Sequence, residues 1–286
     1  MSRLVVVAIA DMHAGHQLGL CNPATVLVRA DDEGQVTEWR PELREIQGYL
    51  WNLYSKDSVE AVEWAAGDPI VLIHDGDATH GQKHPAGLMD ITSAEQEQVA
   101  AWNLKPWLTR AKAVRMIHGT EAHGLLAGST PAETHIAAEL ARQGMDARAV
   151  YHERCTIGGT LFDIAHHGPN ESIRLHLGGD NARRYLKDRM ARDDAMGKAP
   201  ARVYLRGHFH IFIQETVRQQ LGGVWCESTL IVLPSLCGAS AFSRKVTQSL
   251  PLLCNGMVLF EIVDGRLREI RPLVEWTDLR TEEVIA

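Results

Sequence analysis

Residues 4–13 read LVVVAIADMH, seven apolar residues of strand type that run directly into an aspartate and a histidine. The same arrangement recurs four times: PIVLIH before Asp75-Gly76-Asp77, AVRMIH before Gly119-Thr120-Glu121-Ala122-His123, LFDIAH ending at His166 with His167 beside it, and ARVYLRG before His208-Phe209-His210. Of the 14 histidines, 11 lie in or within a few residues of these five windows. Parallel strands present side chains beyond their carboxyl ends at one edge of a sheet, so the pattern predicts a metal site there.

The composition limits the class of protein. With 286 residues, 45% of them hydrophobic, the chain can bury a large core. The balance of 29 basic against 36 acidic residues argues against a general nucleic-acid coating protein, although divalent cations would reverse the local field at a phosphate site. The five cysteines contain no CxxC pair and are interpreted as core thiols. Because no run of 18 apolar residues occurs, we expect a cytoplasmic protein without membrane contact.

The order of elements favours one α/β domain over residues 1–286. A β-hairpin is expected where two alternating runs flank an acidic turn that ends in glycine, and we expect it to form an insertion over residues 17–40. The helical patterns cover residues 41–65, 92–108, 130–144 and 180–195, with a capping box at Thr92 and Glu95 and Pro131 in the first helical position of the third. The remaining expected strands are 3–10, 201–206, 224–233, 256–262 and 267–272. Alternation of strands and helices followed by a strand-rich half predicts a four-layer αββα sandwich of two mixed β-sheets flanked by helices.

Taken singly, each of the five windows is a weak motif, but their order and placement are specific. Together they resemble the calcineurin-like metallophosphoesterase superfamily, whose pattern runs D-x-H, G-D, G-N-H-[DE], H and G-H-x-H, each at a strand end. The resemblance covers residues 9–210, and four of the five blocks match in type and order. Borderline divalent ions accept both imidazole nitrogen and carboxylate oxygen. The resemblance implies two divalent ions as cofactors, Mn²⁺ first, with Fe, Zn or Ni as alternatives.

The resemblance also implies the ligand set. Asp77 would bridge the ions, Asp11, His13 and His210 would complete one of them, and His166 and His208 would serve the other. His166 is favoured over its neighbour His167, because the residue that closes the strand is the ligand in the family.

The third window departs from the family pattern. Thr120 occupies the asparagine position by strict counting, but its hydroxyl is a poor neutral ligand. We therefore favour Glu121 as the metal ligand and His123 as the catalytic residue that faces the substrate. In the alternative arrangement His123 itself binds metal, and no acidic side chain comes from this loop.

These residues predict a hydrolase that cleaves phosphate esters, with monoesters and diesters both open. A metal-bridging hydroxide would attack phosphorus, and His123 would stabilise charge or protonate the departing oxygen. His80 and His84 follow Asp77 closely and are expected to line the substrate pocket. The substrate could be a small molecule or a nucleic acid, and with a nucleic-acid substrate the protein would be a nuclease. The oligomeric state stays open. The altered third window motivates one alternative, a weakly active or non-catalytic binding or assembly protein that retains the fold.

Overall fold

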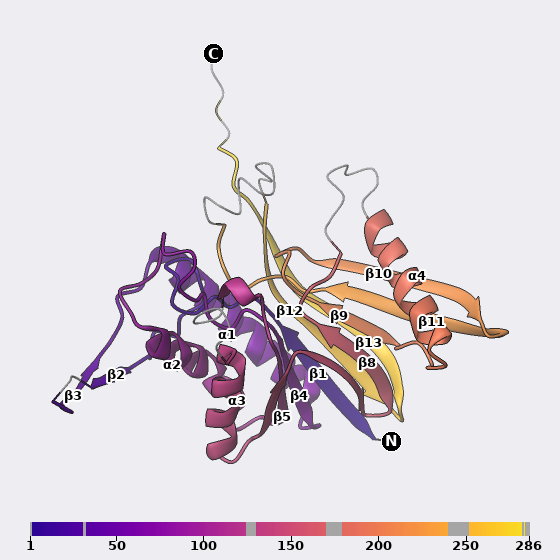
Figure 1. Ribbon diagram of the computed structural model, residues 1–286, viewed down its shortest axis with the longest axis horizontal. Helices are drawn as coiled ribbons and strands as arrows, with labels where there is room; N and C mark the ends of the chain where they lie inside the picture. Colours follow the sequence, from indigo (N-terminus) through magenta and orange to yellow (C-terminus); the bar gives the residue numbers. More distant parts are fainter. Residues whose placement is uncertain are drawn as a thin grey trace.

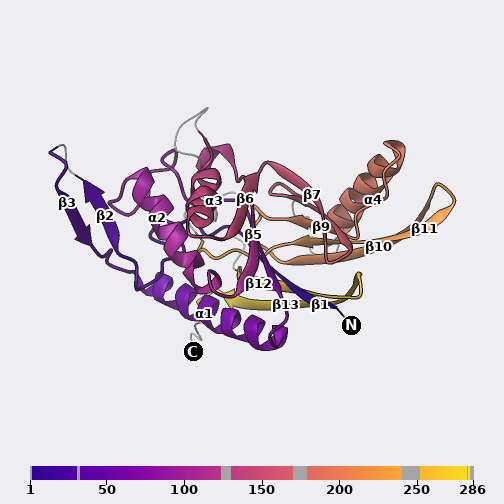
Figure 2. The ribbon, with the colours of Figure 1, turned by 90° about the horizontal axis from the view of Figure 1, so that it is seen from below.

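Two mixed β-sheets lie face to face, with helices on both outer faces (Figure 1, Figure 2). The computed structural model describes residues 2–30, 33–123, 130–169, 179–239, 252–281 and 283. Three clusters of buried apolar side chains fill the spaces between the layers. The architecture is therefore a four-layer αββα sandwich, which confirms the fold class expected from the sequence.

The first sheet contains six strands, which are, in order across the sheet, β13 (Arg266–Asp278), β12 (Leu252–Val263), β1 (Arg3–Ile9), β4 (Ile70–Asp75), β5 (Ala111–Ile117) and β6 (Asp146–Val150). Strands β1, β4, β5 and β6 pair with their neighbours in parallel, whereas β12 pairs antiparallel with both β1 and β13. The carboxyl ends of β1, β4 and β5 therefore meet at the same edge.

The second sheet contains five strands, which are, in order, β10 (Ile213–Leu221), β11 (Val224–Val232), β9 (Val203–Arg206), β8 (Thr160–Ala165) and β7 (His152–Ile157). Its centre is parallel, because β9 pairs in parallel with both β8 and β11, and the outer pairs are antiparallel. The histidine windows at the ends of β8 and β9 therefore also lie at one edge.

Helices α1 (Glu45–Ala65), α2 (Ser93–Leu104) and α3 (Ala132–Arg142) cover the first sheet, and α4 (Asp180–Ala195) covers the second. Strand β1 shows how the layers are specified. Val5 and Val7 pack with the helix-side cluster, whereas Val6 and Ala8 pack in the cluster between the sheets. A strand buried on both faces has to be apolar throughout, which explains the uninterrupted run of residues 4–10. No helix within the described residues is long and apolar enough to cross a bilayer.

The expected hairpin forms a separate two-stranded sheet, β2 (Leu27–Ala30) and β3 (Val36–Trp39), which projects from one side of the molecule (Figure 2). Its tip, residues 31 and 32, lies outside the described residues. The hairpin is tied to α2, since the Gln98 side chain hydrogen-bonds both the N–H and the carbonyl of Val28. Arg29 also forms a two-pronged hydrogen bond to Glu95.

Several element boundaries differ from the sequence prediction. The helix expected over 41–65 begins only at Glu45, and the one expected over 92–108 ends at Leu104, where Pro106 continues the chain in a 3-10 turn, η1 (Lys105–Trp107). Pro131 stands just before α3 instead of inside it. Strand β10 is absent from the predicted elements, because its sequence IQETVRQQL is mostly polar and only Val217 is buried.

Candidate metal centre

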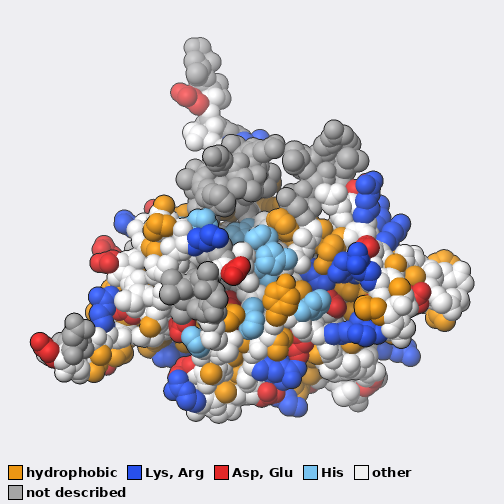
Figure 3. Space-filling view, viewed as in Figure 1, with side chains coloured by type: hydrophobic (Ala, Val, Ile, Leu, Met, Phe, Trp, Pro, Cys, Tyr) orange, Lys and Arg blue, Asp and Glu red, His pale blue; other side chains and the backbone are white. Residues whose placement is uncertain are grey.

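All five sequence windows converge at one edge of the sandwich. Figure 3 shows histidine side chains gathered near the centre of one face of the molecule. The backbone there is unusual: of the seven described non-glycine residues with positive φ, five belong to the windows, namely Asp11, His13, Asp77, His208 and His210. Non-glycine residues rarely adopt this conformation, and such positions cluster at functional sites.

One group of donors consists of Asp11, His13 and His210. The Nε2 atoms of His13 and His210 lie 3.2 Å apart, and His210 Nε2 lies 3.2 Å from Asp11 Oδ1. A donor atom from each of Asp11, His13 and Asp77 also lies within 4.8 Å of the other two. Ring nitrogens and a carboxylate that face one another in this way form a ready set of metal ligands.

A second group consists of Asp77, His166 and His208, whose donor atoms likewise lie within 4.8 Å of one another. Asp77 Oδ2 accepts a hydrogen bond of 3.0 Å from His166 Nε2, while the other ring nitrogen of His166 contacts the carbonyl of Asp75 at 2.6 Å. Asp77 is therefore common to both groups. His166 is buried, and its neighbour His167 is exposed, so the structure brings His166 into the cluster.

Two glycines allow the loops to approach closely. A Cβ atom at Gly119 would lie 2.1 Å from Asp77 Oδ1, and one at Gly76 would lie 2.3 Å from His166 Nδ1. Gly76 also has φ 85°, which favours glycine. Any side chain at these two positions would displace Asp77 or His166.

The turn after β5 differs from the arrangement favoured by the sequence. Thr120 faces the cluster: its hydroxyl lies 3.2 Å from Asp77 Oδ2 and 3.1 Å from His208 Nδ1, and its N–H donates to Asp77 Oδ1 at 2.6 Å. Glu121 begins the short turn η2 (Glu121–His123), is exposed, and belongs to none of the potential ligand groups found among the described residues. The structure thus puts Thr120, not Glu121, beside the other donors.

The predicted catalytic histidine, His123, lies at the margin of the cluster. Its Nε2 is 3.8 Å from Asp77 Oδ2, and its ring centroid is 4.6 Å from that of His13. Its Nδ1 contacts the carbonyl of His80 at 2.8 Å, so Nε2 is the nitrogen that faces the donors.

The two predicted substrate-pocket histidines have different surroundings. His80 is buried between the rings of His13, His16 and His123. His84 is half-buried, and its ring centroid lies 6.3 Å from that of His123. Only His84 therefore retains appreciable exposure.

The sequence prediction missed Cys237 near the site. The buried Cys237 sulfur lies 3.3 Å from His210 Nδ1, on the ring edge opposite Nε2. It follows β11 in the sequence, 27 residues after His210, and no motif marks it.

The electrostatics of the cluster suit a cation. Burial alone would raise the pKa of Asp77, but the charge and the hydrogen bond of His166 hold it well below its usual range. Burial would lower the pKa of His166, yet Asp77, Asp11 and Asp75 raise it to about 10. Burial lowers the pKa of His208 to about 4 and that of His13 well below its ordinary value. In the metal-free protein Asp11 and Asp77 are ionised and the His13 and His208 rings are neutral, which is the form that binds metal. The raised pKa values of His166 and His210 mean that these two rings would release protons on binding an ion.

One buried atom provides a direct test of fit. Asp11 Oδ1 is fully buried and has no well-oriented hydrogen-bond donor among the described residues, although His210 Nε2 lies close to it. A buried carboxylate oxygen without a donor is costly unless it meets a positive charge. Two carboxylates, four imidazoles and the Thr120 hydroxyl are a suitable oxygen and nitrogen donor set for two borderline divalent ions.

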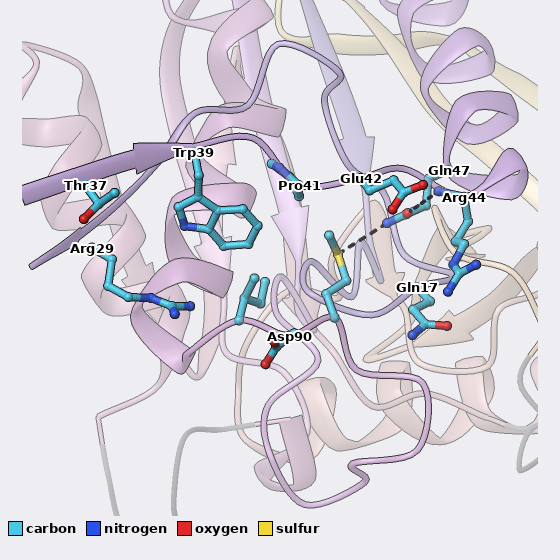
Figure 4. A pocket seen from close by; sticks show the side chains of 11 residues that line it. Gln17, Arg29, Thr37, Trp39, Pro41, Glu42, Arg44, Gln47 and Asp90 are labelled. Atoms are coloured by element: carbon cyan, nitrogen blue, oxygen red, sulfur yellow. Dashed lines mark hydrogen bonds between the residues drawn. The ribbon is translucent and has the colours of Figure 1, made fainter. Parts of the chain in front are cut away.

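A cavity of about 590 Å³ lies between the hairpin and the start of α1 (Figure 4). Trp39 and Arg29 line it on the hairpin side, and Gln17 and Arg44 line it near α1. None of the potential metal ligands found among the described residues lines this cavity. It is therefore separate from the candidate metal centre.

No known family model matches the chain, and no curated protein sequence matches it. Among solved structures, the sulfate thiohydrolase SoxB of Thermus thermophilus in complex with glycerol is 10% identical with a TM-score of 0.35, covering 98% of this chain and 57% of SoxB. The NAD nucleotidase NadN of Haemophilus influenzae is 9% identical with a TM-score of 0.35, covering 98% of this chain and 54% of NadN. The chain thus spans little more than half the length of either protein. Similarity this low assigns neither a family nor a function.

Proposed function

We propose that this protein is a binuclear metal-dependent hydrolase of phosphate esters. The observation that carries the proposal is the position of Asp77, whose carboxylate belongs to both groups of potential ligands. A carboxylate shared in this way would provide a ligand to each of two cations, as in two-metal hydrolytic sites. Asp11, His13 and His210 would hold one ion, and His166 and His208 would hold the other, with the Thr120 hydroxyl orienting Asp77 and His208.

The protein residues around the ions would each have a separate task. When bound, the two ions would lower the pKa of a shared water and polarise the phosphoryl oxygens. The carbonyl of His80 accepts from His123 Nδ1, which fixes the ring with Nε2 toward the cluster. In its protonated form, His123 would donate from Nε2 to an equatorial phosphoryl oxygen or to the departing oxygen. His84, at the more exposed side of His123, would contact the leaving group.

The test combines metal analysis with a panel of esters. Purified protein should contain Mn, Fe, Zn or Ni, bind two equivalents, and hydrolyse bis-aryl or mono-aryl phosphates. Asp77→Ala should lose both the metal and the activity, whereas Asp188→Ala, which changes an exposed carboxylate on α4, should retain both. Comparing the two ester types separates diesterase from monoesterase, and single-stranded DNA and RNA then test nuclease activity. Two equivalents of metal without turnover of any ester would instead favour a binding or assembly role.

A further inference from the structure

His80 makes a specific contact behind one of the proposed ligands. It follows Asp77 by three residues and is buried, with its ring centroid 4.3 Å from that of His16. Its Nδ1 lies 3.4 Å from Nδ1 of His13, and its Nε2 lies 3.2 Å from the carbonyl oxygen of His84. Both ring nitrogens of His80 therefore have a partner within the protein.

These partners determine where the protons are. A carbonyl oxygen can only accept, so Nε2 of His80 carries the hydrogen that is donated to His84. A neutral imidazole has one N–H, so Nδ1 of His80 is an acceptor, and the hydrogen between the two rings belongs to His13 Nδ1. The Nε2 of His13 is then left with a free lone pair, and this is the atom that lies 3.2 Å from His210 Nε2.

We infer that His80 is a positioning residue, which fixes the tautomer and the orientation of His13 so that its Nε2 points at the metal. The inference rests on the proposed function, because it takes His13 as a metal ligand. Partners of this kind, which accept the second N–H of a ligating histidine, typically alter metal affinity 10–100-fold when removed. The backbone carbonyl of the same residue holds His123. Residue 80 thus connects a proposed ligand with the proposed proton donor.

A third metal ion is the competing explanation, since ring nitrogens of His13, His80 and His123 lie within 4.8 Å of one another. Nδ1 of His123 and Nε2 of His80 are both directed at carbonyl oxygens, so Nε2 of His123 and Nδ1 of His80 are the nitrogens that a third ion would use. The obstacle is His13, which would have to bind metal through both of its nitrogens and lose its remaining proton.

The experiment titrates metal-free protein with Mn²⁺ by calorimetry. His80→Phe keeps an aromatic ring but has no acceptor, and we expect two equivalents to bind with one affinity weakened roughly 10–100-fold. His80→Gln offers an amide oxygen to His13 and should recover part of the affinity. His135→Gln is the matched control, because His135 is exposed on α3 and pairs with Glu97 of α2, away from the proposed ligands. Thermal unfolding of each metal-free variant reports whether the fold is retained.

A second readout needs no variant. Long-range ¹H–¹⁵N spectra of the metal-free protein should give His80 with its proton on Nε2 and His13 with its proton on Nδ1. The opposite tautomer at either ring would overturn the inference, as would unchanged affinities in His80→Phe. Binding of three equivalents by the wild type and two by His80→Phe would make His80 a ligand and would also overturn it. If Asp77→Ala binds Mn²⁺ like the wild type, the proposed function itself fails; if only His80→Phe is unaffected, the positioning role alone fails.

Discussion

Two neighbouring side chains after β5 distinguish between two arrangements of the site. Thr120→Val removes a hydroxyl and keeps the shape of the side chain, and Glu121→Gln removes a charge and keeps its shape. The Thr120 hydroxyl lies 3.2 Å from Asp77 Oδ2 and 3.1 Å from His208 Nδ1, whereas Glu121 is exposed. We therefore expect Thr120→Val to weaken metal binding and Glu121→Gln to leave it nearly unchanged.

The size of the effect follows from these contacts. Removing a group that orients metal ligands lowers affinity by roughly 10–100-fold, which corresponds to about 1.4–2.8 kcal/mol. A hydrogen bond to a charged group contributes about 1.5–3 kcal/mol, which is the same range. The loss should not be larger, because the backbone N–H of Thr120 still donates to Asp77 Oδ1 at 2.6 Å in the valine variant. For Glu121→Gln the change should stay within roughly twofold, as for an exposed and screened charge.

The assay is an Mn²⁺ titration of metal-free protein, which reports the affinity of each site separately. The weakened site should be the one that contains His166 and His208. Thr120→Ser keeps the hydroxyl and should bind close to the wild type. The opposite result, in which Glu121→Gln loses Mn²⁺ affinity and Thr120→Val does not, would contradict this reasoning. Glu121 would then be the metal ligand that the sequence favoured.

Two further predictions concern stability. Arg206 is 1% exposed and donates to Asp163 Oδ1 at 2.6 Å and to Tyr185 Oη at 2.7 Å, so Arg206→Met should lower the free energy of unfolding in urea by about 3–5 kcal/mol, and Asp163→Asn in the same chain should restore part of it. A loss below roughly 1 kcal/mol would show that the buried pair is not stabilising relative to an apolar side chain. Secondly, the pKa of His166 is raised from 6.5 to about 10, so its contribution is fully present below pH 6.5 and is lost as the pH rises through 10. The unfolding free energy of EDTA-treated wild type should therefore fall toward that of His166→Asn between these pH values, and a difference that does not vary with pH would contradict this.

The sequence predicted the layers well because burial dictates their composition. Strands β1 and β4 are buried on both faces and are therefore continuous apolar runs, which predict buried strands from the sequence alone. Strand β10 escaped prediction because it lies at an edge and alternates polar side chains over most of its length. The exact helix ends were harder to predict. A proline such as Pro131 can stand just before a helix or in its first turn, and only the backbone conformation shows which.

The sequence predicted the kind of side chains that form the candidate metal centre, but not each residue in it. Asp11, His13 and Asp77 stand at strand ends of the first sheet and His208 at a strand end of the second, so the packing of the two sheets brings them together. The choice between Thr120 and Glu121 depends on the direction of one turn, which spacing does not determine. Cys237 comes from the loop after β11, the parallel neighbour of β9, and meets His210 through the packing of the two loops that follow these strands.

The backbone strain at this edge argues that the site and not the fold accounts for these residues. Asp11, His13, Asp77, His208 and His210 have φ between 44° and 76°. Left-handed conformations cost non-glycine residues roughly 1–2 kcal/mol each, so together they approach the net stability of a typical domain, about 5–15 kcal/mol. Glycine would remove that cost, and the chain uses it at the adjacent Gly76, where a side chain would strike His166. Ionisable side chains at five strained positions around one cluster fit the proposed function, because a bound cation would offset their strain and the repulsion between Asp11 and Asp77.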